Sequence, residues 1–344
     1  MALPLLQGDS PATTLDAVPR ASRLHYAGLL IGLLGLAALA GVVLHLGDVE
    51  RFAALLRALA PAWLLLALLL QSGTYVSIAA SWRTGLRQAG TRHTLRDLLP
   101  LALAKLFVDQ SVPTGGFSGS AFLVAALARR GVPRPTCVGA LIVNLLGYYA
   151  AYLLAGLIGI TLLWLRHELR TWMLVIAAAS TLVALATPGA VWWLHKYGRR
   201  ELDWLRRLPG VRSLLEAATE APVDLRHHPR ALLATAALNF AVIALDAATL
   251  WTMLHALGLD TPYAVVFPSF LLAMMITTIG AIPLGLGSFE ATCVAALTLQ
   301  GVPIEGALAA TLLLRGCTTW LPMLPARHEL REAPEASGDH TPSP

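Results

Sequence analysis

The 344-residue sequence is poor in charged residues, which make up only 13% of the chain. Soluble domains usually carry about 25% charged residues, so the composition argues against an ordinary water-soluble domain. Only three cysteines are present, without C-x-x-C spacing, and neither a disulfide framework nor a metal site is supported. Walker A, H-E-x-x-H, nucleophile-elbow and dinucleotide-binding motifs are all missing. We therefore predict no catalytic residues, no cofactor and no metal.

Apolar residues are abundant instead, at 56% of the chain with a mean hydropathy of +0.66. They cluster into runs of the roughly 20 residues that a helix needs to cross a bilayer. The sequence therefore predicts an all-α fold, a polytopic transmembrane helix bundle with about seven full spans. These are expected near 26–46, 61–82, 136–165, 171–195, 231–257, 263–282 and 304–325. We interpret the first run as a retained signal anchor, because the leader before it is long.

Lys and Arg concentrate in alternate loops, and this bias predicts the orientation of the chain. The tail 1–24 is expected in the cytoplasm, as is the loop 196–230, which holds eight of the 25 positive residues. The tail 327–344 is expected to be disordered and outside. Because the basic residues lie in short loops between spans, the pI near 9.4 does not indicate a nucleic-acid partner.

An internal repeat is the most informative pattern. Residues 113–144 and 283–314 align without gaps, and 12 of the 32 positions are identical. The matches include Pro113 with Pro283, the VAAL runs, and the Gly-Val-Pro sequences at 131–133 and 301–303. Shared richness in Ala and Leu does not explain aligned Pro and Gly residues, so we interpret the pattern as a duplication.

Each copy has a Pro and Gly break, then an apolar helix of about 12 residues. At 1.5 Å per residue this helix is about 18 Å long, too short to cross a bilayer. We predict two re-entrant hairpins, near 98–127 and 284–301, whose half-helices direct free N–H groups into a polar cavity. With four spans between the copies, this topology makes them parallel; an odd number would make them inverted. The candidate substrate-binding residues at these half-helix ends are Gly115, Gly116, Ser118, Ser120, Gly285, Gly287, Ser288 and Glu290, together with Arg315.

Charged residues within apolar segments cost several kcal/mol unless they are paired or hydrated. Glu290 and Arg315 could form a structural ion pair, or Arg315 could contact an anionic headgroup with Glu290 as its partner or a proton carrier. Lys105 and Asp109 are four residues apart on one helical face, where mutual neutralisation is at least as favoured as ligand contact. Asp246 stands alone in its span and is a candidate proton relay.

Other polar residues have simpler roles in this interpretation. Arg129 and Arg130 lie where lipid phosphates are expected, and orienting the protein is favoured over specific lipid recognition. Asn144 and Asn239 are predicted to form hydrogen bonds between helices.

The hairpins, together with SWRTGL at 81–86 and LLLRGCTTWLPMLP at 312–325, resemble a known family. It is the lysylphosphatidylglycerol synthase transmembrane-region, or flippase-like, family of integral membrane proteins. The resemblance covers about residues 25–326 and implies a multi-pass protein of the bacterial inner membrane with a cytoplasmic N-terminus. In bifunctional members this region translocates an aminoacylated phospholipid between leaflets.

This sequence departs from the family pattern in two respects. Bifunctional members continue into a soluble aminoacyl-transferase domain, whereas this chain ends about 20 residues after its last predicted span, so we do not expect it to charge a lipid with lysine. Many relatives also have an acidic residue in the first hairpin, where this chain has Gly119 and Ser120. Ser120 is the repeat equivalent of Glu290.

Three functions remain open. The leading hypothesis is a translocator of lipids or lipid-linked headgroups, with membrane lipids, especially anionic ones, as partners. A second is an accessory membrane subunit of a separate lipid-modifying enzyme, in an aminoacyl-lipid, hopanoid or glycolipid pathway. A third is a transferase that uses a lipid-linked donor, for which Asp109 and Glu290 are the only plausible carboxylate pair.

Overall fold

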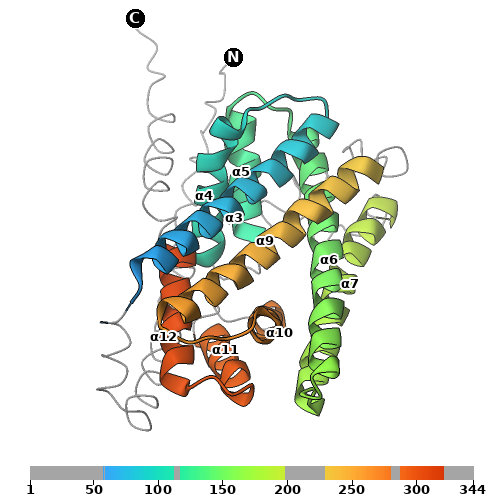
Figure 1. Cartoon of the computed structure of the whole chain (residues 1–344). Coiled ribbons are helices and arrows are strands. Elements are labelled where there is room, and N and C mark those ends of the chain that lie inside the picture. The colour runs from blue at the N-terminus through green and yellow to red at the C-terminus, as the bar shows by residue number, and fades with distance from the viewer. Residues whose placement is uncertain (1–56, 58, 112–116, 198–228, 280–286, 321–344) are drawn as a thin grey trace, which may run out of the picture.

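A computed structural model describes residues 57, 59–111, 117–197, 229–279 and 287–320. Within these ranges the chain is helical and has no strand, which confirms the all-α class (Figure 1). The tails 1–24 and 327–344, the span 26–46 and most of the loop 196–230 lie outside the described residues. The helices are α3 (Pro61–Gln88), α4 (Leu95–Ser111), α5 (Phe117–Arg129), α6 (Arg134–Leu165), α7 (Thr171–Tyr197), α9 (Pro229–Ala256), α10 (Tyr263–Ile279), α11 (Ser288–Leu299) and α12 (Ile304–Arg315), followed by the π-helical turn η4 (Gly316–Trp320).

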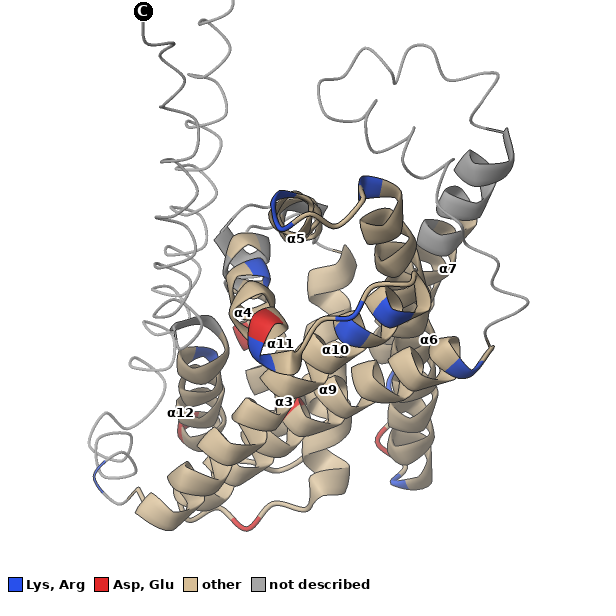
Figure 2. Ribbon diagram, turned by 90° about the horizontal axis from the view of Figure 1, so that it is seen from above, with Lys and Arg blue, Asp and Glu red and all other residues tan. Residues whose placement is uncertain are grey.

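Three of these helices are long and apolar enough to cross a membrane: α3, α6 and α9, of 28, 32 and 28 residues. Their large apolar side chains do not all point into the protein. Leu157 on α6 is 64% exposed and Leu233 on α9 is 70% exposed, as expected for surfaces that acyl chains cover. Lys and Arg lie mainly at helix ends and in loops (Figure 2). The chain is a multi-pass membrane protein.

The predicted span 263–282 corresponds to α10, which is described as a helix up to Ile279. α10 packs against α11, so these two helices form a hairpin. Gln300, just after α11, donates from Nε2 to the carbonyl oxygen of Val265, in the first turn of α10, at 3.3 Å. The second hairpin therefore comprises α10 and α11, and its expected range 284–301 contained only the second arm.

The first hairpin, α4 with α5, is closed in the same way. Arg130, just after α5, donates from Nη1 to the carbonyl oxygen of Asp97, in the first turn of α4, at 3.0 Å. Arg130 and Gln300 are repeat equivalents, 170 residues apart. Hydrogen bonds from Thr94 hold the pKa of the Asp97 carboxyl below its usual value, and they cap the exposed start of α4.

Matching prolines extend the repeat beyond the segments that the sequence alignment found. Pro100 in α4 and Pro268 in α10 are each at the sixth position of their helix. α3 and α9 both have 28 residues and both begin with Pro. Each copy thus contains a long helix, a Pro-containing arm, a short arm and a following helix. The long helix and the Pro-containing arm are 168 residues apart in the two copies, whereas the segments 113–144 and 283–314 are 170 residues apart. A gap-free comparison of the sequence with itself therefore did not detect them.

The two copies are inverted, which corrects the expectation that they are parallel. α3 and α9 lie side by side in opposite directions (Figure 1). The amide of Ala60, before α3, donates to the carbonyl of Ala256, the last residue of α9, at 3.0 Å, while Asn239 near the start of α9 bonds Ser81 near the end of α3. Because α3 and α9 are the equivalent long helices of the two copies, their opposite directions mean that the second copy is inverted relative to the first.

The prediction that the short helix of each copy ends at Gly-Val-Pro is confirmed. Gly131 and Gly301 have φ of +82° and +91°, a left-handed conformation that glycine adopts without steric cost. The following amides, of Val132 and Val302, each donate to a carbonyl five residues back at 3.1 Å. Proline then precedes the first residue of α6 and of α12. The same turn chemistry therefore ends the short arm of both hairpins.

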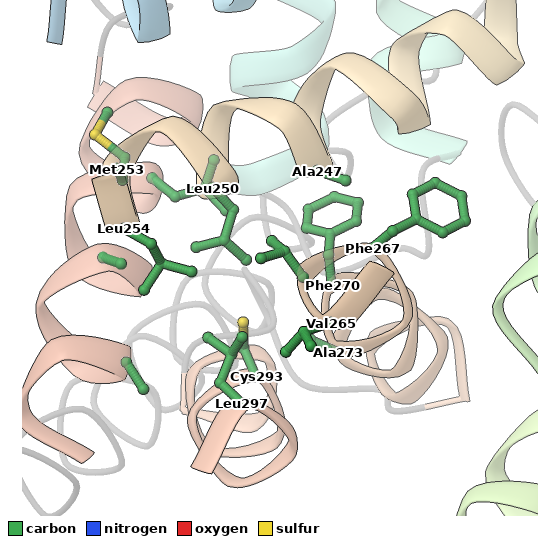
Figure 3. Packing of buried hydrophobic residues seen from close by; sticks show 14 of the residues in the cluster. Ala247, Leu250, Met253, Leu254, Val265, Phe267, Phe270, Ala273, Cys293 and Leu297 are labelled. Carbon is green, nitrogen blue, oxygen red and sulfur yellow. The ribbon is translucent and has the colours of Figure 1, made fainter. Parts of the chain in front are cut away.

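Buried apolar side chains hold the second hairpin against α9. Leu250 and Leu254 of α9 face Phe270 of α10, with Cys293 and Leu297 of α11 beneath them (Figure 3). Cys293 is fully buried and not disulfide-bonded, so it acts as a small packing residue, as predicted. This packing places the first residues of α11 beside the last residues of α12.

Candidate functional site

The N-terminus of α11 forms around Gly287 and Glu290. Gly287 is the N-cap residue, with φ of +83°, and its amide donates to Oε2 of Glu290 at 2.7 Å. A carboxylate in the first turn offsets the positive end of the helix dipole. Glu290 is only 1% exposed, so this carboxylate depends on protein partners rather than water.

Arg315, the last residue of α12, is the second partner. Its Nε donates to Oε1 of Glu290 at 2.6 Å, so both carboxylate oxygens are hydrogen-bonded. Its Cζ atom lies 4.9 Å from the centre of the Phe289 ring, within cation–π range. The arginine side chain is 17% exposed. The structure therefore brings together the two charges that the sequence suggested could pair.

This arrangement has two chemical consequences. First, the ion pair joins the half-helix α11 to α12, which fits the structural interpretation of the pair. Second, a guanidinium carries five N–H donors in a planar fork, and Nε is the one that donates to Oε1 of Glu290. Such a fork matches phosphate geometry, so one arginine can serve a carboxylate and an anionic headgroup together.

The remaining predicted ligands around the hairpins are only partly described. Ser288 is the first residue of α11, and Ser118 and Ser120 lie in the first turn of α5. Gly115, Gly116 and Gly285 lie outside the described residues. Ser120 occupies the place in α5 that Glu290 has in α11, so the first hairpin has no carboxylate there. Within the described ranges, no group of three or more His, Cys, Asp or Glu side chains could hold a metal.

The secondary candidates lie on other helices than Glu290. Lys105 and Asp109 both lie on α4, four residues apart. Arg129 and Arg130 are exposed at the far end of α5 from Ser120, and Arg130 closes the first hairpin. Arg130 therefore has a structural contact that the sequence did not indicate.

Asp246 has partners, which corrects the prediction that it stands alone. Its Oδ1 accepts hydrogen bonds from Thr74 Oγ1 at 3.0 Å and Gln71 Nε2 at 3.4 Å, both on α3. The sequence could not show this pairing, because the contact depends on the antiparallel register of two helices 168 residues apart. These polar side chains give the α3–α9 interface a specific register.

A second polar cluster lies in the same interface and confirms the predicted role of Asn144 and Asn239. Asn239 Nδ2 donates to Ser81 Oγ at 3.0 Å and to Asn144 Oδ1 at 3.1 Å. Ser81 also donates to Asn144. Three helices, α3, α6 and α9, thus share one hydrogen-bond network.

Comparison with known protein families finds a match. The model for the lysylphosphatidylglycerol synthase TM region matches residues 27–326, most of the chain. A search of curated proteins gives no match.

Proposed function

This chain belongs to the lysylphosphatidylglycerol synthase TM region family, and on that basis we propose that it translocates phosphate-bearing lipids between membrane leaflets. The family assignment supports a membrane lipid-related role. The proposal adds the transport step, the bacterial inner membrane as its location, a cytoplasmic N-terminus, and an anionic phospholipid or lipid-linked headgroup as the substrate.

The ion pair at the start of α11 carries this proposal. Half-helices that begin within the bilayer in inverted repeats are the usual location of a transporter's binding site. Here the N-terminus of α11 lies beside Arg315, and both favour a bound phosphate. Glu290 would orient the guanidinium and balance its charge when no headgroup is bound.

Inverted copies also suggest how access could alternate. Each copy keeps its own closing contact, Arg130 to Asp97 or Gln300 to Val265, so each hairpin could move as a unit. The α3–α9 interface lies between the copies and would act as the axis. Acyl chains would stay in the bilayer while the headgroup crosses.

The transferase alternative is less favoured by the geometry. A carboxylate that acts as a general base needs an oxygen available to a substrate proton. Both oxygens of Glu290 already accept hydrogen bonds, from Gly287 and Arg315.

Leaflet exchange of labelled phosphatidylglycerol in liposomes tests the proposal. We expect exchange to be faster than in protein-free liposomes, and Arg315→Lys to slow it about tenfold. Lysine keeps the charge beside Glu290 but loses the planar fork, and about 1.4 kcal/mol of lost transition-state stabilisation corresponds to tenfold in rate.

The matched control is Arg87→Lys, an exposed arginine in the last turn of α3. This variant should exchange lipid at the wild-type rate. Equal rates for wild-type and protein-free liposomes, or for wild-type and Arg315→Lys, would count against the proposal.

A further inference from the structure

A polar pocket lies away from the ion pair, where the turn between α6 and α7 meets the end of α11. Its volume is about 280 Å³, and His167, Glu168, Arg170, Leu299 and Gln300 contribute to its lining. Gln300 and Glu290 are at opposite ends of α11, about 15 Å apart at 1.5 Å per residue. The pocket is therefore separate from the candidate transport site.

Two buried oxygens in residues that line this pocket, Oε2 of Glu168 and Oε1 of Gln300, accept no hydrogen bond from the described residues. The other polar side-chain atoms of Glu168 and Gln300 already have partners within the protein. Glu168 Oε1 pairs with Arg166 at 3.3 Å, while Gln300 Nε2 donates to Ser269 Oγ at 2.7 Å and to the Val265 carbonyl. The carbonyl partner identifies which amide atom of Gln300 is the nitrogen. Buried acceptors normally have donors, so the pocket is suited to a ligand with N–H or O–H groups.

The same pocket carries donors for an anion. Arg170 and His167 line it from the α6–α7 turn, and both are exposed. His167 has φ of +57°, the one positive value at a non-glycine residue in the described ranges. Glycine occupies the comparable turns at 90, 131, 258 and 301. A left-handed conformation costs a residue with a Cβ about 1–2 kcal/mol, and such cost often marks a functional position.

The surroundings indicate a position at the membrane surface. Trp164 and Leu165, directly before the turn, are 64% and 61% exposed, and Leu299 on the pocket wall is 45% exposed. Exposed tryptophan followed by arginine at the end of a long apolar helix is typical of the boundary between acyl chains and headgroups. A ligand in the pocket can therefore have its polar part among these side chains and its acyl chains along α6 and α11.

We propose that this pocket binds the headgroup of a phosphatidylethanolamine-type phospholipid. The phosphate accepts hydrogen bonds from Arg170 and His167. The primary ammonium donates to Glu168 Oε2 and Gln300 Oε1, and the carboxylate complements its charge. A pocket of about 280 Å³ is far larger than the roughly 30 Å³ of one water molecule, so it has room for such a headgroup.

Lipid titrations monitored by native mass spectrometry of the detergent-solubilised protein test the proposal. Phosphatidylethanolamine and phosphatidylcholine with identical acyl chains share the phosphate, but the choline group has no N–H donor. We expect phosphatidylethanolamine to bind at least about tenfold more tightly, as two charge-assisted hydrogen bonds allow. Equal affinities would overturn the proposal. Glycerophosphoethanolamine, which has no acyl chains, should bind much more weakly; binding as tight as that of the lipid would assign the pocket to a soluble ligand instead.

Two variants locate the binding in the pocket. Gln300→Leu should reduce the preference for ethanolamine over choline, because Glu168 Oε2 is then the one acceptor left for the ammonium. His167→Gly should weaken both lipids without lowering the unfolding temperature, because glycine adopts the turn conformation without strain. Arg87→Ala, at the end of α3, should change neither the preference for ethanolamine nor the affinity for either lipid. An unchanged preference in Gln300→Leu, together with unchanged affinities in His167→Gly, would place the bound lipid elsewhere.

Discussion

Replacing Arg315 with alanine will destabilise the protein by about 3–5 kcal/mol, the cost of leaving one partner of a buried ion pair alone. Glu290 is only 1% exposed, and the amide of Gly287 alone would then solvate it. The loss also removes the cation–π contact with Phe289. The midpoint of denaturant unfolding in detergent micelles measures the effect.

A double-mutant cycle separates this effect from lost packing. Arg315→Met keeps much of the side-chain volume, and Glu290→Gln removes the opposite charge. Combining Arg315→Met with Glu290→Gln should cost less than Arg315→Met alone, because no uncompensated charge stays buried. Strictly additive costs would mean that the two residues do not interact, and the ion pair would then not join α11 to α12.

Gly147→Ala will destabilise the protein by about 1–3 kcal/mol, because it overpacks the contact of α6 with α9. A Cβ atom at position 147 would lie 2.8 Å from Cβ of Thr235 and 3.0 Å from the backbone nitrogen of Ala236. Backbone atoms of α9 cannot move away as a flexible side chain can. Small residues at such positions allow close approach of membrane helices. The same unfolding midpoint provides the readout.

The matched control is Gly189→Ala on α7, where a new Cβ would meet no atom of the described residues within 4 Å. This change should stabilise the protein slightly, by up to about 1 kcal/mol, through the higher helix propensity of alanine. If both variants behaved alike, the close approach of α6 to α9 at Gly147 would be wrong.

Features that depend on local chemistry were predictable from the sequence. The long apolar runs gave α3, α6 and α9, and the Gly-Val-Pro sequences gave the left-handed stops at Gly131 and Gly301. The pairing of Glu290 with Arg315 followed from the cost of burying a lone charge. In each case a few neighbouring residues, or one strong electrostatic constraint, decide the outcome.

Features that depend on the relative placement of distant helices were not predictable. α10 has the composition of a span, and the sequence did not show that it packs against α11 as a hairpin arm. The inversion of the repeat depends on the antiparallel contact of α3 with α9. The partners of Asp246 on α3 depend on that inversion. The polar pocket likewise required the α6–α7 turn to meet the end of α11.

The central claim is that the two hairpins enter the membrane from opposite sides. The most direct test is to determine from which side of the membrane a cysteine in each hairpin can be labelled. In a background lacking Cys137, Cys293 and Cys317, Arg130→Cys and Thr298→Cys introduce thiols at exposed positions near the end of each short arm. A membrane-impermeant maleimide applied to sealed vesicles of both orientations should label the two thiols from opposite sides. Labelling of both from the same side would contradict the inverted arrangement and the transport proposal that rests on it.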